Sequence, residues 1–157
     1  MKKKICIVIA DYYDDITRLL IKGTKEKILE AESNDIYSFG KIKKVLGPLP
    51  SKLFLNDTCF YVPGVFEIPV TISKLISKYD AFVALGCVIK GKTPHFDLIS
   101  KAVVNEIMDL SVKNKKPIGN GIITCLNMNQ AIERADPKRK NMGGAAVTAA
   151  LKTLANF

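Results

Sequence analysis

The longest apolar run in the sequence is Ala81–Ile89, which is interrupted only by Gly86. It is far shorter than the roughly 20 residues that a membrane-spanning helix needs. Its short length and its Val, Leu and Ile content favour a β-strand that is apolar on both faces, and Ile5–Ala10 has the same character. Strands of this kind occur in parallel sheets that helices cover on both sides. The two runs therefore predict an α/β fold.

Strand and helix patterns alternate along the remainder of the chain. Further strands are expected at Thr58–Val62 and Gly121–Cys125, and helices at 15–32, Phe66–Tyr79, 93–112, Met128–Ala135 and Gly143–Leu154. This order predicts a three-layer α/β/α arrangement with four parallel strands and right-handed crossovers. A length of 157 residues fits a single domain, 1–157.

The segment 33–57 interrupts this alternation before the second expected strand. It contains Gly40, Gly47, Pro48 and Pro50, but it also has too many apolar residues for a disordered linker. We expect an ordered insertion that contains a short hairpin.

Composition narrows the functional classes. The net charge of +9 comes from 24 basic and 15 acidic residues, but the lysines are scattered, without an aromatic RNA-binding motif, a helix-turn-helix signature or finger spacing. We therefore expect small anionic substrates rather than nucleic acid. No convincing signal peptide or membrane span is present, so a cytoplasmic protein is expected. The four cysteines form no CxxC pair, which predicts reduced core thiols and no zinc site.

The segment Lys90–His95 is the strongest candidate for a functional site. Ligands of open parallel sheets bind outside the carboxyl ends of the strands, and this segment follows the longest apolar strand. Thr93 suits a helix N-cap and Pro94 the first helical position. The free N–H groups of the helix start, together with Lys90 and Lys92, would then attract an anion. His95 in the first turn could exchange protons near neutral pH. By spacing alone, a capped helix with an incidental histidine is an equally good interpretation.

Three further groups of residues are weaker candidates. Glu67 lies in the first turn of an expected helix, where it could accept hydrogen bonds from ligand hydroxyls, although a surface acid matched to the helix dipole explains it as well. Tyr12 and Tyr13 could stack on a planar ring, and Arg134 could bind phosphate. Exposed tyrosines after a strand and a solvated arginine on a helix are the simpler alternatives.

Together these segments resemble the 6,7-dimethyl-8-ribityllumazine synthase family. The matching stretches are Val62–Pro69 (VPGVFEIP), Ala84–Asp97 (ALGCVIKGKTPHFD), Gly121–Thr124 with Gln130–Ala135 (GIIT and QAIERA), and Asn141–Ala146 (NMGGAA). The resemblance implies a flavodoxin-like fold with four parallel strands. It also implies condensation of 5-amino-6-(D-ribitylamino)uracil with 3,4-dihydroxy-2-butanone 4-phosphate, with loss of phosphate and water and with no cofactor or metal. The family forms homo-oligomers, as a pentamer or a 60-subunit shell.

The same resemblance implies a role for each matching residue. Those implied to bind the pyrimidine and the ribityl chain are Tyr12, Val65, Phe66, Glu67, the backbone of Cys87, Val88 and Ile89, and Asn120 from the adjacent subunit. Those implied to hold the phosphate are Lys92, Thr93 and, from the neighbouring subunit, Arg134. His95 would transfer protons.

Two alternatives remain open at this level. The archaeal-type riboflavin synthases share the fold but dismutate two lumazines, a reaction without a phosphate substrate, so the turn at Gly91–His95 favours condensation. The other is a catalytically silent protein that binds a flavin or a lumazine or forms a shell. Its only support is the departure from the family pattern at Asn120 and Met142.

Overall fold

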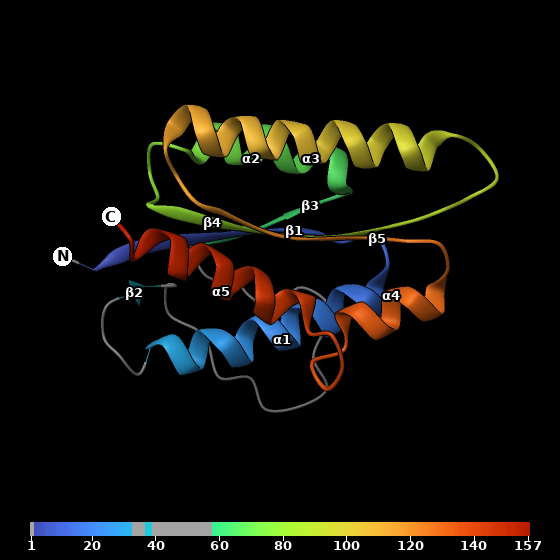
Figure 1. The fold of residues 1–157 in the computed structure, drawn as a ribbon, viewed down its shortest axis with the longest axis horizontal. Helices are drawn as coiled ribbons and strands as arrows, with labels where there is room; N and C mark the ends of the chain where they lie inside the picture. Colours follow the sequence, from blue (N-terminus) through green and yellow to red (C-terminus); the bar gives the residue numbers. More distant parts are fainter. Residues whose placement is uncertain (1, 33–36, 39–57) are drawn as a thin grey trace.

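The computed structural model describes residues 2–32, 37–38 and 58–157, which form a parallel β-sheet between two groups of helices (Figure 1). The strands are β1 (Lys3–Ala10), β2 (Tyr37–Ser38), β3 (Cys59–Val62), β4 (Ala81–Ile89) and β5 (Ile118–Cys125). The helices are α1 (Asp14–Glu32), the 3₁₀ turn η1 (Val65–Glu67), α2 (Ile68–Leu75), α3 (His95–Asn114), α4 (Met128–Ala135) and α5 (Met142–Leu154). The predicted three-layer α/β/α architecture is confirmed.

The sheet is four strands wide, in the order β3-β1-β4-β5, and each neighbouring pair is parallel. The two-residue strand β2 lies along the same edge of β1 as β3, next to Lys3 and Lys4, whereas β3 pairs with Ile7–Ala10. The sequence did not predict β2. The hairpin expected within 33–57 lies outside the described residues.

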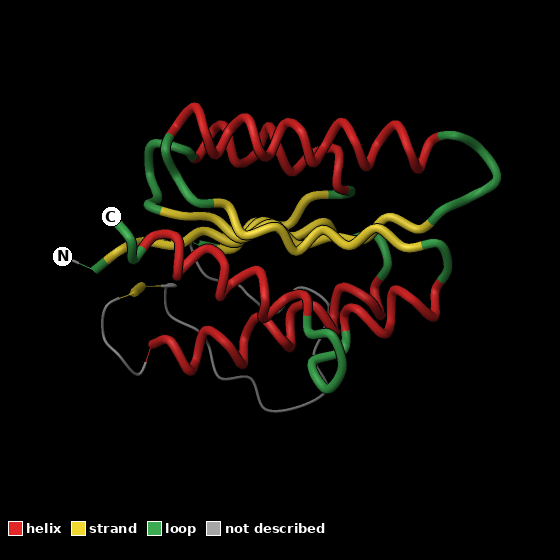
Figure 2. The backbone as a smooth tube through the Cα atoms, in the orientation of Figure 1, coloured by secondary structure: helices red, strands yellow, loops and turns green. Residues whose placement is uncertain are grey.

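The central position of β1, with helices on both faces of the sheet, explains why its residues are apolar in succession instead of alternating with polar ones. Successive side chains of a strand point to opposite faces. One face of β1 packs against α1 and α5 through Ile5, Ile7 and Ile9. The other packs against α2 and α3 through Cys6, Val8 and Ala10. Figure 2 shows the two helical layers that cover these faces.

The helix predicted at Phe66–Tyr79 is wrong at both ends. It begins with the 3₁₀ turn η1, and α2 ends at Leu75. The carbonyl oxygens that follow α2 accept hydrogen bonds from the ammonium group of Lys116, at 2.5 Å from Ile76 and 2.6 Å from Tyr79. A charged donor from a residue distant in sequence thus satisfies the groups that a longer helix would have paired internally.

The other helix and strand boundaries differ from the predicted ones by only a few residues. Strand β5 begins at Ile118 rather than at Gly121, because the backbone N–H of Phe82 on β4 already bonds to the carbonyl oxygen of Pro117 (2.9 Å).

No helix in the described part of the chain combines the length and apolar character that a transmembrane span requires.

Close approach of α5 to β5 depends on a small residue in the strand. A Cβ atom added to Gly119 would lie 2.0 Å from the carbonyl oxygen of Ala146 and 3.2 Å from the Cβ of Ala150, both on α5. The backbone oxygen cannot rotate away as a flexible side chain could. The contact between helix and sheet therefore requires the absence of a side chain at Gly119.

We predict that Gly119→Ala lowers the free energy of unfolding by about 1–3 kcal/mol, because α5 must shift away from the sheet. Urea denaturation measures the effect. Gly91→Ala is the matched control, since a Cβ there meets nothing within 4 Å. Equal denaturation midpoints for the two variants would contradict the prediction.

Candidate active site at the carboxyl edge of the sheet

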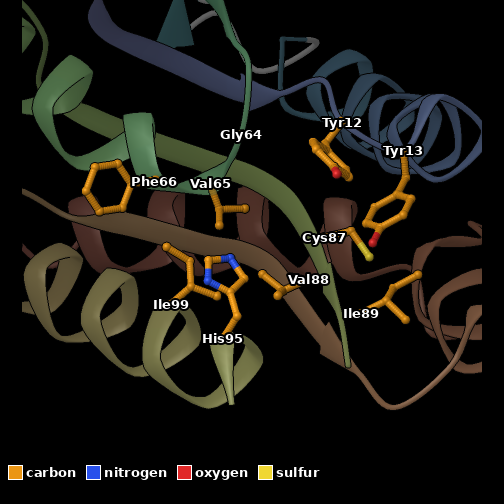
Figure 3. Close-up of a pocket in the computed structure, with 10 residues that line it drawn as sticks. All are labelled: Tyr12, Tyr13, Gly64, Val65, Phe66, Cys87, Val88, Ile89, His95 and Ile99. Atoms are coloured by element: carbon orange, nitrogen blue, oxygen red, sulfur yellow. The ribbon is translucent and has the colours of Figure 1, made fainter. Parts of the chain in front are cut away.

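A cavity of about 250 Å³ opens at the carboxyl edge of the sheet, where β1, β3 and β4 end (Figure 3). Its walls come from the loop after β1, from the turn η1, from the end of β4 and from the first turns of α3. The lining residues are Tyr12, Tyr13, Gly64, Val65, Phe66, Cys87, Val88, Ile89, His95 and Ile99. Seven of the site residues predicted from the sequence therefore line one cavity of a single chain.

The end of β4 has an open edge toward this cavity. β4 pairs with β5 as far as Ile89, but with β1 only as far as Leu85. Within the described residues, Gly86–Ile89 therefore has no neighbouring strand on the β1 side. Backbone groups along that edge are available to a ligand.

The direction of one hydrogen bond shows which backbone groups point to the open edge. The N–H of Lys90 donates to the carbonyl oxygen of Cys125 on β5, with the two atoms 2.9 Å apart. Backbone groups of successive residues alternate between the two edges of a strand. Those of Cys87 and Ile89 consequently face the cavity side, whereas Val88 turns its backbone to β5 and contributes its side chain.

His95 is the first residue of α3, and its side chain is exposed. Figure 3 shows the imidazole between the side chains of Ile99 and Val88, on the cavity side of the helix. The ring is therefore placed at the rim, where it can exchange protons with both a ligand and water.

The predicted cap of this helix is wrong by one residue. Pro94, not Thr93, occupies the N-cap position, and its carbonyl oxygen accepts hydrogen bonds from the backbone N–H groups of Asp97 and Leu98, both at 3.2 Å. The Thr93 hydroxyl accepts only a long bond from the N–H of His95 (3.5 Å). Because its capping bond is weak, this hydroxyl can turn toward a ligand at little cost.

Aromatic rings form the outer walls of the cavity. Tyr12 is 71% exposed and Phe66 is 70% exposed, so both present large apolar faces to solvent beside the opening. Tyr13 meets Tyr12 edge to face, with ring centroids 4.9 Å apart and an interplanar angle of 73°. Such rings suit the binding of a planar heterocycle.

Glu67 does not line this cavity. Its carboxylate accepts a hydrogen bond from the backbone N–H of Gly64 (3.0 Å), which fixes the turn before η1. It faces a neighbouring groove between α2 and α3, whose other lining residues are Phe66, Pro69, Val70, Ser73, Ala102, Val103 and Glu106. Glu67 is next to the candidate site and holds its wall in place.

Four other predicted residues also lie outside the cavity of the single chain. Lys92 and Thr93 are exposed in the turn before α3. Asn120 is exposed on the edge strand β5, where its side-chain oxygen accepts a hydrogen bond from the N–H of Ile122 (3.0 Å). Arg134 is exposed on α4, on the face of the sheet opposite to α3 (Figure 1). The sequence predictions had assigned Asn120 and Arg134 to a neighbouring subunit.

Three lining residues were not among the predicted site residues: Tyr13, Gly64 and Ile99. The signal for Ile99 was available, because it lies four residues after His95 on the same face of α3. Gly64 precedes the predicted Val65 directly. Tyr13 had been noted as a possible stacking residue beside Tyr12.

Two neighbouring thiols lie at this end of the sheet: Cys87 in the cavity lining and Cys125 next to it. Burial raises the pKa of Cys87 to about 12, and the neighbouring Cys125 adds to the shift. Burial also raises the pKa of Cys125, although the positive charge of Arg134 opposes the effect. Both thiols are therefore neutral at physiological pH, which fits packing rather than nucleophilic chemistry. In the described ranges, no group of three or more His, Cys, Asp or Glu side chains could hold a metal ion.

The fold and the cavity define a flavodoxin-like α/β protein with a ligand pocket at the carboxyl edge of a parallel sheet. Comparison with known proteins gives the particular family. The family model of 6,7-dimethyl-8-ribityllumazine synthase matches residues 54–157. The chain belongs to this family.

Individual relatives extend the match over nearly the whole chain. The 6,7-dimethyl-8-ribityllumazine synthase of Methylorubrum populi is 37% identical over 159 residues, which cover 97% of this chain and 81% of the relative. That of Bartonella tribocorum is 38% identical over 161 residues, covering 99% of this chain and 91% of the relative. That of Limosilactobacillus reuteri is 36% identical, covering 93% and 82%.

The raised thiol pKa of Cys87 predicts how stability depends on pH. In the unfolded chain the thiol ionises near its ordinary pKa of 9.0, whereas in the folded protein it ionises near 12. Above pH 9 the unfolded state therefore binds fewer protons than the folded state, and the free energy of unfolding falls as pH rises from about 9 toward 12.

Urea denaturation of wild type and Cys87→Ala at a series of pH values measures this contribution. We expect a shallower decline in the variant, whatever the cavity left by the missing sulfur costs at neutral pH. Parallel curves for the two proteins would contradict the assignment.

Proposed function

We propose that this chain condenses 5-amino-6-(D-ribitylamino)uracil with 3,4-dihydroxy-2-butanone 4-phosphate to form 6,7-dimethyl-8-ribityllumazine, with release of phosphate and water. The observation that carries the proposal is the cavity itself. It combines an open strand edge for a heterocycle, aromatic walls and an imidazole at the rim, in a chain of this family. The amine of the pyrimidine is the nucleophile, so the protein has only to position two substrates and move protons.

The pyrimidine binds against the open edge of β4. Backbone groups of Cys87 and Ile89 face that edge and offer hydrogen bonds to the polar rim of the ring. Tyr12 stacks on one face of the ring, and Val65 and Phe66 pack along the ribityl chain. One carboxylate oxygen of Glu67 accepts a hydrogen bond from the N–H of Gly64. The other oxygen accepts hydrogen bonds from the hydroxyls of the ribityl chain.

The phosphate of the second substrate binds at the turn before α3. Lys92 supplies charge and Thr93 a hydroxyl, and the first N–H groups of the 20-residue helix α3 point to the same place. His95 lies two residues after Thr93 in the chain. An imidazole there can pass protons between the substrates while phosphate leaves.

Arg134 completes the phosphate site from a second subunit, and Asn120 closes the ring pocket in the same way. Both are exposed and lie outside the cavity of their own chain. Exposed apolar side chains accompany each half of such an interface. Leu126, Met128 and Ile132 lie near Arg134, and Phe66 and Val70 lie beside the α2–α3 groove. Two different surfaces that meet head to tail form a ring when the rotation between subunits closes. The ring proposed here is a pentamer, alone or in a 60-subunit shell, and the enzyme acts in the cytoplasm.

We predict that His95→Ala reduces kcat by about 10²–10⁴-fold without abolishing product, because positioning of the substrates survives the loss of one proton-transfer group. The assay mixes purified protein with both substrates and follows lumazine absorbance. Lys101→Ala, an exposed substitution on the same helix outside the cavity lining, is the control. Absence of product from wild type would overturn the proposed function.

The shared site predicts complementation between two impaired variants. His95→Ala and Arg134→Ala subunits, co-expressed in equal amounts, form some interfaces that pair an intact His95 with an intact Arg134. Random assembly restores about a quarter of the sites. Activity per subunit should rise accordingly above that of either variant alone.

Co-expression of His95→Ala with Thr93→Ala is the matched control. These two residues come from the same chain, so no mixture of the subunits can rebuild a complete site. If the first mixture, like this control, shows no activity above the mean of its two parent variants, Arg134 does not act across an interface.

A further inference from the structure

Tyr13 lies between the cavity and the core beneath it. Its ring packs on the cluster that joins β4 and β5 to α1 and α4. It also lines the cavity, unlike the other residues of that cluster apart from Cys87 and Ile89. The ring therefore forms part of the cavity floor, on the face of the sheet opposite to His95 (Figure 3).

The backbone and the neighbouring ring hold Tyr13 in place. Its carbonyl oxygen accepts a hydrogen bond from the N–H of Thr17 (2.8 Å), at the start of α1. Its ring meets Tyr12 edge to face. Tyr12, by contrast, is mostly exposed. Tyr13 is the better fixed of the two tyrosines, so its polar end has a defined position.

That polar end lies beside Cys87, in the part of β4 that has no neighbouring strand on the β1 side among the described residues. Figure 3 shows the hydroxyl of Tyr13 pointing toward the sulfur of Cys87, and Cys87 influences the ionisation of the phenol. Tyr13 and Cys87 both line the cavity, and the backbone groups of Cys87 face its open edge, so the hydroxyl lies close to these groups. Burial raises the pKa of Tyr13, with contributions from Cys87 and Tyr12, so the phenol stays protonated and can donate a hydrogen bond.

We infer that Tyr13 is a further substrate-binding residue, whose hydroxyl bonds to a polar edge atom of the heterocyclic substrate held against the end of β4. This inference rests on the proposed function. It assigns the hydroxyl a part in recognising the pyrimidine and none in binding the phosphate, because Lys92 and Thr93 lie outside the cavity that Tyr13 lines. Tyr12 stacks on the face of the ring, whereas the hydroxyl of Tyr13 hydrogen-bonds to its edge.

Tyr13→Phe tests the inference, because it keeps the ring on the core and removes only the hydroxyl. We expect the KM for the pyrimidine to rise about 10-fold, as the loss of one hydrogen bond predicts. The KM for the butanone phosphate and kcat should change by less than about 2-fold. Calorimetric titration with the pyrimidine substrate alone should show the same weakening without turnover.

Tyr79→Phe is the matched control, since Tyr79 packs edge to face on Phe82 (5.9 Å between centroids) away from the cavity. If wild type and Tyr13→Phe bind the pyrimidine equally while wild type forms lumazine, the inference is wrong and the proposed function stands. An equal rise in both KM values would point to general distortion of the site and would also overturn it. A wild type that neither binds the pyrimidine nor forms product would overturn both.

Discussion

The candidate active site depends on a mismatch in strand pairing. β4 and β5 end together at Ile89 and Cys125, whereas β1 stops pairing with β4 at Leu85. The chain leaves β1 after Ala10 and enters α1, so the two tyrosines and the turn η1 surround the part of β4 that β1 leaves uncovered. A backbone edge without a neighbouring strand is a liability on an exposed surface. Here aromatic side chains border the open edge, and the proposed function uses it to bind a flat ring.

Patterns confined to one element could be predicted from the sequence. The bounds of β4 were predicted as observed, because Asp80 and Lys90 limit an apolar run that is buried on both faces. The length of α2 could not be predicted from its own residues, since the carbonyl groups after it bond to Lys116, which lies forty residues after Ile76 in the chain. The position of Thr93 relative to the cap was also missed, because both Pro94 and Thr93 are acceptable N-terminal residues and only the backbone angles decide.

The candidate site shows the same division. Residues near the end of a strand, such as Cys87, or at the start of a helical turn, such as Val65 and His95, meet at one edge because the strands are parallel. The sequence was sufficient to group them. Tyr13 could be suspected but not placed, since its importance comes from the direction of a ring relative to Cys87. Lys92 and Arg134 lie outside the cavity of the single chain, and only the proposed function brings Arg134 to it, across a subunit interface.

Lys116 gives the site a mechanical property. Helices α2 and α3 both start at the cavity edge and end at the opposite edge of the sheet, where the ammonium of Lys116 bonds to the carbonyl oxygens of Ile76 and Tyr79. The two helices are thus tied together at the ends farthest from the cavity. Because this tie lies at the amino edge of the sheet, it joins the two helices without using any residue of the cavity lining.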